Sequence, residues 1–172
     1  MSDPSTTEFA HVSSGLHYDY YWRDYTGDIP RDAVPGGRDV NHRPTYIGHV
    51  YVHKYGICTV TIYPGITTVV PSVTGYYIFD HIKILCSPFK EKFRWVATDA
   101  EKLHVQLIGK HLVRGGVDYN GKTTNIGRIL HKGEIIVAKV CGSVIGNAKL
   151  YYCDNNSEKS VNSYEVLIYD LN

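Results

Sequence analysis

The sequence is poor in the residues that favour helices and has a single methionine in 172 residues. Tyrosine and glycine are abundant instead, with 15 and 16 copies. Methionine, alanine and leucine are typical of helices, whereas tyrosine suits half-buried strands and glycine suits tight turns. This balance predicts an all-β chain.

Long apolar runs are also missing, and none would span a bilayer. The first residues, MSDPSTTEFAHV, contain neither the basic stretch nor the apolar stretch of a secretory signal. We therefore expect no membrane span and a cytoplasmic location. Vesicle association and non-classical secretion remain open.

The net charge is close to zero, because the sequence has 18 basic and 17 acidic residues, and it contains no long run of like charge. This excludes the electrostatic signature of a nucleic-acid-binding protein. None of the four cysteines has CxxC spacing, and in a reducing cytosol we expect free thiols. Cys58, Cys86 and Cys141 lie in apolar, strand-like runs, which is typical of small buried side chains.

The usual nucleotide-binding and nucleophile motifs are absent, and no metal site is expected. The segment after Asp118 resembles a calcium loop, but Ile129 occupies the position of the closing acid. His49 and His53 have the spacing of a helical zinc motif, yet strand sequence separates them, so we interpret them as surface or edge histidines. We predict no cofactor and no enzymatic activity, with a hydrolase as a weak alternative.

A tandem duplication organises the chain. Residues 34–62 align with residues 113–140, with a constant shift of 79 as far as Gly48 and of 78 beyond it. Both copies contain Gly-Gly-x-Asp followed by Ile-Gly, and a tryptophan precedes each copy. This self-similarity predicts two repeats, residues 17–92 and 93–172, after a loose N-terminal segment, residues 1–16.

Alternating side chains and turn residues predict the strands of each repeat. Strands are expected at residues 17–22, 46–52, 58–62, 67–70, 76–85, 103–108, 125–130, 135–141 and 164–169. Residues 28–38 are expected to form an irregular loop that ends in a Gly-Gly turn with positive φ, and residues 87–94 a hinge between the repeats. Asn155-Asn156-Ser157 is interpreted as a polar turn.

The aspartates of Gly-Gly-x-Asp, Asp39 and Asp118, have a structural and a functional interpretation. A short acid after two glycines is typical of a turn whose carboxylate accepts backbone amides. The same carboxylate, held rigidly, could accept hydrogen bonds from two neighbouring sugar hydroxyls. Lys139, among apolar neighbours, is either a lysine whose amine reaches water or a donor to the same ligand.

The ordered motifs resemble the DM9 repeat. In the second repeat they are Trp95, Gly115-Gly116-Val117-Asp118, Ile126-Gly127-Arg128, Lys139-Val140 and Tyr164-Glu165-Val166-Leu167. The first repeat has Trp22, a loop with proline and alanine that ends in Gly36-Gly37-Arg38-Asp39, Ile47-Gly48-His49 and Thr61-Ile62. The resemblance implies antiparallel repeats, intertwined about a pseudo-two-fold axis.

The resemblance also implies mannose binding by the aspartate of Gly-Gly-x-Asp and the lysine of the Lys-Val strand. In this sequence these are Asp118 with Lys139, and Asp39 in the first repeat. Thr61 occupies the lysine position of the first repeat, and His49 occupies the arginine position. Without the charged donor the first site should bind more weakly.

From the resemblance we expect a lectin for mannose or mannose-containing glycans, acting in innate immune recognition of microbes or parasites. A single shallow sugar site is weak, so avidity would come from two sites per chain or from a homodimer. The chain ends soon after Tyr-Glu-Val-Leu, so we expect no pore-forming module. The alternative is an infection- or stress-responsive adaptor or trafficking protein with vestigial sugar pockets.

Overall fold

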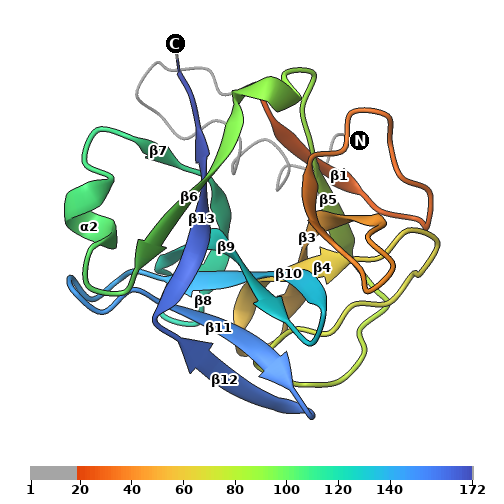
Figure 1. Ribbon diagram of the computed structural model, residues 1–172. Helices are drawn as coiled ribbons and strands as arrows, with labels where there is room; N and C mark the ends of the chain where they lie inside the picture. Colours follow the sequence, from red (N-terminus) through yellow and green to blue (C-terminus); the bar gives the residue numbers. More distant parts are fainter. Residues whose placement is uncertain (1–18, 172) are drawn as a thin grey trace.

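The computed structural model describes residues 19–171, and nearly all of their regular structure is antiparallel β-sheet (Figure 1). The all-β prediction is confirmed, while the predicted loose segment 1–16 lies outside the described residues. The strands are β1 (Tyr21–Asp24), β2 (Pro35–Arg38), β3 (Pro44–Val52), β4 (Gly56–Ile62), β5 (Ile82–Cys86), β6 (Phe93–Asp99), β7 (His111–Leu112), β8 (Arg114–Asp118), β9 (Thr123–His131), β10 (Glu134–Cys141), β11 (Lys149–Asp154), β12 (Ser157–Val161) and β13 (Ser163–Tyr169). The helical elements are the 3-10 turn η1 (Lys90–Lys92) and the one-turn helix α2 (Leu103–Gln106).

A ring of paired strands forms the centre of the fold. The pairing runs β10-β2-β3-β4-β8-β9, and β9 pairs back onto β10. The strands β11 and β12 extend the sheet from β10, while β13 and β6 extend it from β9. Closing the ring pairs both edges of its strands, and this satisfies backbone groups that an open edge would leave to water.

Two pairings of this ring join segments from different halves of the sequence at equivalent positions. Ile57 of β4 pairs with Val117 of β8, and Ile135 of β10 pairs with Arg38 of β2. The shifts of 78 and 79 seen in the sequence relate one pair to the other. Each half thus contributes strands to the other half's ladder, while the repeat boundaries and the axis itself stay predictions.

Gly37 and Gly116 permit these crossings, but not through the Gly-Gly turn with positive φ that we expected. Neither glycine has positive φ, and residues 35–38 form a strand with a bulge rather than the end of a loop. A Cβ on Gly37 would lie 2.0 Å from the carbonyl oxygen of Ile135, and one on Gly116 would lie 2.0 Å from that of Ile57. Close backbone approach therefore explains the glycines.

Three apolar clusters fill the molecule. One draws its buried residues from residues 25–86, another from residues 103–168, and the central one from both halves. The central cluster contains three equivalent pairs: Ile47 with Ile126, Leu85 with Leu167, and Val34 with Val113. Burial of so much apolar surface between the halves predicts that they unfold together.

The predicted strand at residues 103–108 is wrong, because Leu103–Gln106 is the helix α2. Leu103 and Leu107, four residues apart, are buried, whereas Val105 and Ile108 are exposed. Asp99 accepts the amides of Glu101 and Lys102 just before the helix. The buried residues have the spacing of a helix, although the apolar and polar residues of this segment also fit the alternation of a strand.

Other segments also differ from expectation, among them β6 and β8, where no strand was predicted. Residues 67–81 contain one isolated bridge, between Val69 and Ile78, and the strand β5 begins only at Ile82. The hairpin β11–β12 was not predicted as strands, although its polar turn was, with positive φ at Asn155 and Asn156. Across residues 19–171, no helix has the length and apolar character needed to cross a membrane.

Candidate functional site

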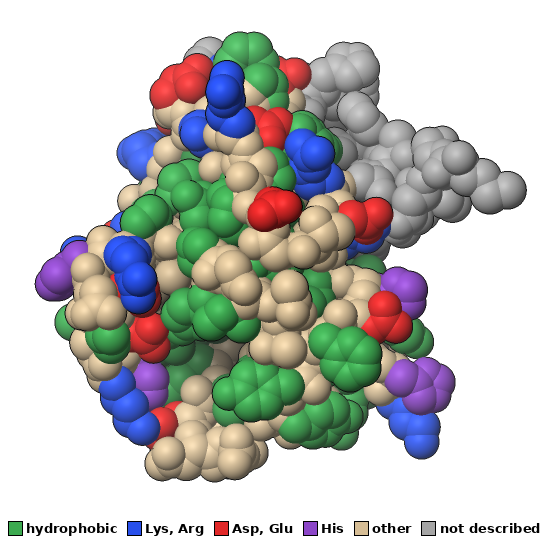
Figure 2. Space-filling model, turned by 90° about the vertical axis from the view of Figure 1, so that its right-hand side faces the viewer, with side chains coloured by type: hydrophobic (Ala, Val, Ile, Leu, Met, Phe, Trp, Pro, Cys, Tyr) green, Lys and Arg blue, Asp and Glu red, His purple; other side chains and the backbone are tan. Residues whose placement is uncertain are grey.

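A cavity of about 520 Å³ opens between the two halves of the chain. Figure 2 looks onto the side of the molecule where residues 63–81 run and shows a recess in that face. The lining comes from β4, residues 63–77, β10, β11 and the turn at 155–156. Its polar and aromatic members include Thr61, Tyr63, Thr68, Ser72, Tyr77, His131, Glu134, Tyr151, Tyr152, Asn155 and Asn156.

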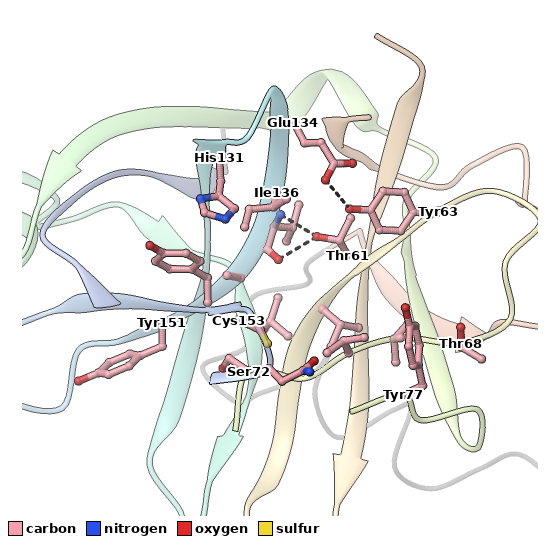
Figure 3. Close-up of a pocket in the computed structure, with 18 of the residues that line it drawn as sticks. Thr61, Tyr63, Thr68, Ser72, Tyr77, His131, Glu134, Ile136, Tyr151 and Cys153 are labelled. Carbon is pink, nitrogen blue, oxygen red and sulfur yellow. Dashed lines mark hydrogen bonds between the residues drawn. The ribbon is translucent and has the colours of Figure 1, made fainter. Parts of the chain in front are cut away.

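One end of the cavity is built around the carboxylate of Glu134 (Figure 3). Tyr63 donates its hydroxyl to Glu134 Oε2 at 3.3 Å, which joins the end of β4 to the start of β10. Burial raises the pKa of Tyr63, and the charges of Glu134 and Asp39 raise it further. Tyr63 therefore stays a neutral hydrogen-bonding group beside two acids that come from different halves.

Thr61 stands beside Tyr63 in the wall, but its hydroxyl already has two partners. Thr61 Oγ1 donates to the carbonyl of Val137 at 3.0 Å and accepts from the amide of Val137 at 2.8 Å. Both bonds are drawn in Figure 3. Because its single proton is used, this hydroxyl can offer a ligand only a remaining lone pair.

Lys139 is not among the residues that line the cavity, but it contacts one of them, Tyr151, and is linked to another, Ser72, through Glu158. Its amine lies 3.3 Å from Glu158 Oε2, and the same oxygen accepts the hydroxyl of Ser72 at 2.6 Å. The amine also lies 5.7 Å from the centre of the Tyr151 ring. Only 12% of the Lys139 side chain is exposed, and its ion pair fastens residues from the 63–81 segment to β10 and β12.

The rim at the β11–β12 turn is held by Asp154. Its carboxylate contacts Lys132 at 2.7 Å, Lys159 at 2.8 Å and His131 at 3.3 Å. Hydrogen bonds from Lys132 and Lys159 hold the pKa of Asp154 well below its usual range. The network keeps His131 at the edge of the cavity, where its ring packs against Tyr152.

Asp39 and Asp118, which we predicted as sugar ligands, both cap turns. Asp118 Oδ1 accepts the amides of Asn120 and Lys122, each at 2.9 Å. Asp39 Oδ1 accepts the equivalent amides of Asn41 and Arg43, at 2.8 and 3.0 Å. The structural interpretation is confirmed for both residues. Contact with a sugar stays a prediction.

In the second repeat, Asp118 and Lys139 belong to different bonding networks. No ion pair joins them within residues 19–171: Asp118 binds its own turn and Lys139 binds Glu158. Both charges act on the Cys141 thiol, whose pKa is raised mainly by burial, lowered by Lys139 and raised by Asp118. The acid and the amine thus lie within electrostatic range of one thiol without contacting each other.

The equivalent place in the first repeat is arranged differently. Tyr63 corresponds to Cys141 under the shift of 78, and it feels the charge of Asp39 as Cys141 feels that of Asp118. The bulky ring and the carboxylate of Glu134 border the large cavity on this side. Sequence reasoning missed Glu134 and Tyr63, because their proximity depends on the exchange of strands between halves.

His49, interpreted from the sequence as a surface or edge residue, is only 6% exposed, so that interpretation is wrong. It lies in β3, which pairs with strands on both edges, and its ring stacks on Trp22 with 3.9 Å between ring centres. Its Nδ1 lies 3.3 Å from the carbonyl oxygen of Gly115. Burial lowers the pKa of His49 to about 3.

Arg128, the residue equivalent to His49, makes the equivalent contacts. Its guanidinium lies 4.4 Å from the centre of the Trp95 ring, and Nη1 donates to the carbonyl of Gly36 at 2.9 Å. Its Nε donates to Glu165 at 2.9 Å. The arginine and histidine of the two Ile-Gly-x motifs therefore link the halves rather than face the cavity.

The cysteines are free thiols, as predicted, and burial raises the pKa of Cys58 to about 11 and of Cys86 to about 12. Both stay protonated and weakly nucleophilic at neutral pH. Across residues 19–171, no group of three or more His, Cys, Asp or Glu side chains is placed to hold a metal ion. The side chains that line the cavity can therefore bind a ligand through hydrogen bonds and through contacts with aromatic rings.

Comparison with known proteins supports the fold and nothing finer. No protein-family model matches the chain, and no curated protein sequence matches it. Among solved structures it is similar to the nematode sperm cell motility protein MFP2B, with 15% identity and a TM-score of 0.56. The match covers 88% of this chain and 46% of that one, so the chain spans less than half the length of MFP2B. At this identity the likeness shows an all-β fold alone.

Proposed function

We propose that the protein is a non-enzymatic carbohydrate-binding protein for mannose or mannose-containing glycans. We propose further that it consists of two DM9-type repeats, residues 17–92 and 93–172, and acts in innate immune recognition of microbes or parasites from a cytoplasmic or non-classically secreted pool. The observation that carries the proposal is the chemistry of the cavity between β4, β10 and β11.

The cavity suits a neutral, polyhydroxylated ligand. Its volume of about 520 Å³ falls within the roughly 300–1,000 Å³ typical of small-molecule sites. Tyr77 and Tyr151 lie on opposite sides of it, with Ser72 between them and the carboxylate of Glu134 at one end (Figure 3). Tyrosine rings pack against the C–H faces of a sugar, and a carboxylate makes strong hydrogen bonds to its hydroxyls.

Support for the repeats comes from contacts that recur under the sequence shift. The Ile57–Val117 and Ile135–Arg38 pairings, the two aspartate-capped turns and the His49 and Arg128 links each occur once per half. Duplication of one unit, followed by exchange of strands, accounts for all three. A DM9 repeat would supply such a unit.

Two binding regions follow from this proposal. The second-repeat region contains Asp118 and Lys139, and both of the Asp118 turn bonds use Oδ1, so Oδ2 is the oxygen we assign to a sugar hydroxyl. The first-repeat region is the cavity, with Thr61 in its wall; Asp39 does not line it, but the charge of Asp39 helps to raise the pKa of Tyr63. Glu134 is the acid we assign to that region.

The test is a titration of the protein with methyl α-mannoside, in which binding is measured by heteronuclear NMR or by calorimetry. Asp118→Asn and Glu134→Gln remove charge while keeping an acceptor, so the Asp118 turn should survive. Each variant should weaken binding roughly tenfold at its own site, since a hydrogen bond to a charged group contributes about 1.5–3 kcal/mol. Ile108→Ala, an exposed site on the α2–β7 turn, is the control. Absence of any mannoside binding to the wild-type protein would refute the proposal.

A second candidate is a protein-binding adaptor with vestigial sugar pockets. One observation favours it: the Lys139 amine is ion-paired with Glu158, and the Thr61 hydroxyl is bonded to Val137, so both polar groups already have partners within the protein. A glycan array separates the two ideas. Binding to mannose-bearing glycans that Asp118→Asn reduces favours the lectin, whereas no glycan binding at all favours the adaptor.

A further inference from the structure

The rim of the cavity continues into an exposed aromatic strip. Tyr77 lines the cavity yet is 72% exposed, and Phe79, two residues along, is 80% exposed. Ile78 between them forms the bridge to Val69 and packs against the apolar cluster of the first half. In an extended segment the side chains at 77 and 79 therefore point away from the core, on one side of the chain.

The spacing of this strip fits a chain of sugar units better than a single sugar. Residues two apart in an extended segment lie about 6.5–7 Å from each other. Phe79 therefore presents its ring one step beyond Tyr77, outside the cavity. Asp80, the next residue, lies on the other side of the alternation, and its carboxylate is 3.5 Å from His81. The face that carries this segment shows hydrophobic side chains beside the recess (Figure 2).

We propose that Phe79 forms a second saccharide subsite, which binds the next sugar of a glycan whose first sugar occupies the cavity. This inference rests on the proposed carbohydrate-binding function and deepens it, because it makes an oligosaccharide the ligand. The Phe79 ring covers the C–H face of the second sugar. Tyr77, at the rim, lies between the two sugars.

A matched pair of ligands tests the subsite: methyl α-mannoside and a linear mannotriose, titrated by calorimetry. The wild-type protein should bind the trisaccharide more tightly than the monosaccharide. Phe79→Ala should reduce trisaccharide affinity about three- to tenfold, the range expected for loss of an aromatic contact. Monosaccharide affinity should stay unchanged, because Phe79 does not line the cavity.

Two further variants separate ring contact from general apolar loss. Phe79→Tyr keeps the ring and should retain trisaccharide affinity, whereas Phe79→Leu keeps apolar surface and should lose it. Ile108→Ala removes a similarly exposed apolar side chain elsewhere and should change neither ligand. Because Phe79 is exposed, each variant should fold, which circular dichroism checks.

The outcomes are distinct. Equal wild-type affinities for the two ligands, or a Phe79→Ala variant that keeps full trisaccharide affinity, overturns the subsite and leaves the cavity as a monosaccharide site. Binding of neither ligand overturns both proposals. Trisaccharide binding that depends on the Phe79 ring, with or without measurable monosaccharide binding, supports the subsite.

Discussion

Thr61 of β4 and Val137 of β10 are joined by two hydrogen bonds that share one hydroxyl. Thr61 Oγ1 donates to the Val137 carbonyl at 3.0 Å and accepts from the Val137 amide at 2.8 Å. A side chain of one half thus completes the backbone bonding of a strand in the other. The contact lies in the wall of the cavity, so the binding region and the junction between the halves share it.

The first prediction is that Thr61→Val destabilises the fold. The variant keeps the shape of the side chain but leaves the amide and carbonyl of Val137 without this partner, which costs about 1–3 kcal/mol. Thr61→Ser keeps the hydroxyl and should cost less than half as much. Urea unfolding measures both, and equal midpoints for Thr61→Val and wild type would show that water replaces the hydroxyl.

The second prediction concerns the glycines at the strand crossings. A Cβ at Gly37 or Gly116 would lie 2.0 Å from a carbonyl oxygen, so either alanine variant must push β2 from β10 or β8 from β4. We expect a loss of about 1–3 kcal/mol or more of unfolding free energy from each. Gly142→Ala is the control, because its Cβ would meet only ordinary contacts, the nearest at 3.5 Å. Comparable stability of all three variants in thermal unfolding would contradict the close approach.

These glycines also show what the sequence could and could not predict. The repeat was visible because Gly-Gly-x-Asp and Ile-Gly recur at a fixed shift, and the antiparallel strands followed from alternation and composition. The partner of each Gly-Gly was not visible, because Ile135 and Ile57 lie far away in the sequence. The motif alone predicts a turn with positive φ, whereas in the structure glycine is required because a Cβ would collide with the carbonyl oxygen of the paired strand.

The candidate site was predicted less completely than the fold. The carboxylate-capped turns at Asp39 and Asp118 follow from local spacing, and both are present. The cavity depends on contacts between the halves, such as Tyr63 with Glu134, which no local pattern signals. His49 was misplaced for the same reason, since its burial depends on Trp22 and on Gly115.

The third prediction is a pH dependence set by His49. Burial lowers the pKa of His49 from its usual value of 6.5 to about 3 in the folded protein. Below pH 6.5 His49 is protonated in the unfolded chain but stays neutral in the folded protein. The free energy of unfolding therefore falls as the pH is lowered, until the pH approaches 3. The slope from this group is at most about 1.4 kcal/mol per pH unit.

The variant His49→Phe keeps a ring on Trp22 and removes the titration. Its unfolding free energy should vary less between pH 6.5 and 4 than that of the wild-type protein. Part of the dependence should remain, because burial also lowers the pKa of His111, to about 4. Chemical denaturation at several pH values gives the slopes, and identical slopes for the two proteins would contradict a buried neutral histidine.

The fourth prediction is that the two repeats bind sugar unequally. In the second repeat, the charges of Asp118 and Lys139 both act on the Cys141 thiol. In the first repeat, Thr61 takes the place of the lysine, and its hydroxyl proton is already donated to the Val137 carbonyl. Asp118→Asn should therefore reduce mannoside affinity more than Asp39→Asn does. Both variants keep an acceptor for the turn amides, but Asp39→Asn also removes the charge from the Asp39–Arg43 ion pair, in which Oδ2 lies 2.9 Å from Arg43 Nε. Equal losses in calorimetry would refute the asymmetry.

The fifth prediction separates two roles for Lys139, as a sugar ligand and as a support for the cavity wall. Removing its amine in Lys139→Met leaves Glu158 with the Ser72 hydroxyl but without its cation. We expect a small loss of stability as well as weaker mannoside binding: the Lys139 side chain is mostly buried, but the Glu158 side chain that loses its cation is 32% exposed, so water screens part of the cost.

A double variant, Lys139→Met with Glu158→Gln, removes the unpaired charge and should recover much of the lost stability. If Lys139 also contacts the sugar, affinity stays low in the double variant even when stability returns. Recovery of both quantities together would instead assign Lys139 to the wall alone. The double-mutant cycle, measured by urea unfolding and by mannoside titration, thus assigns the one cation that the DM9 resemblance places in the site.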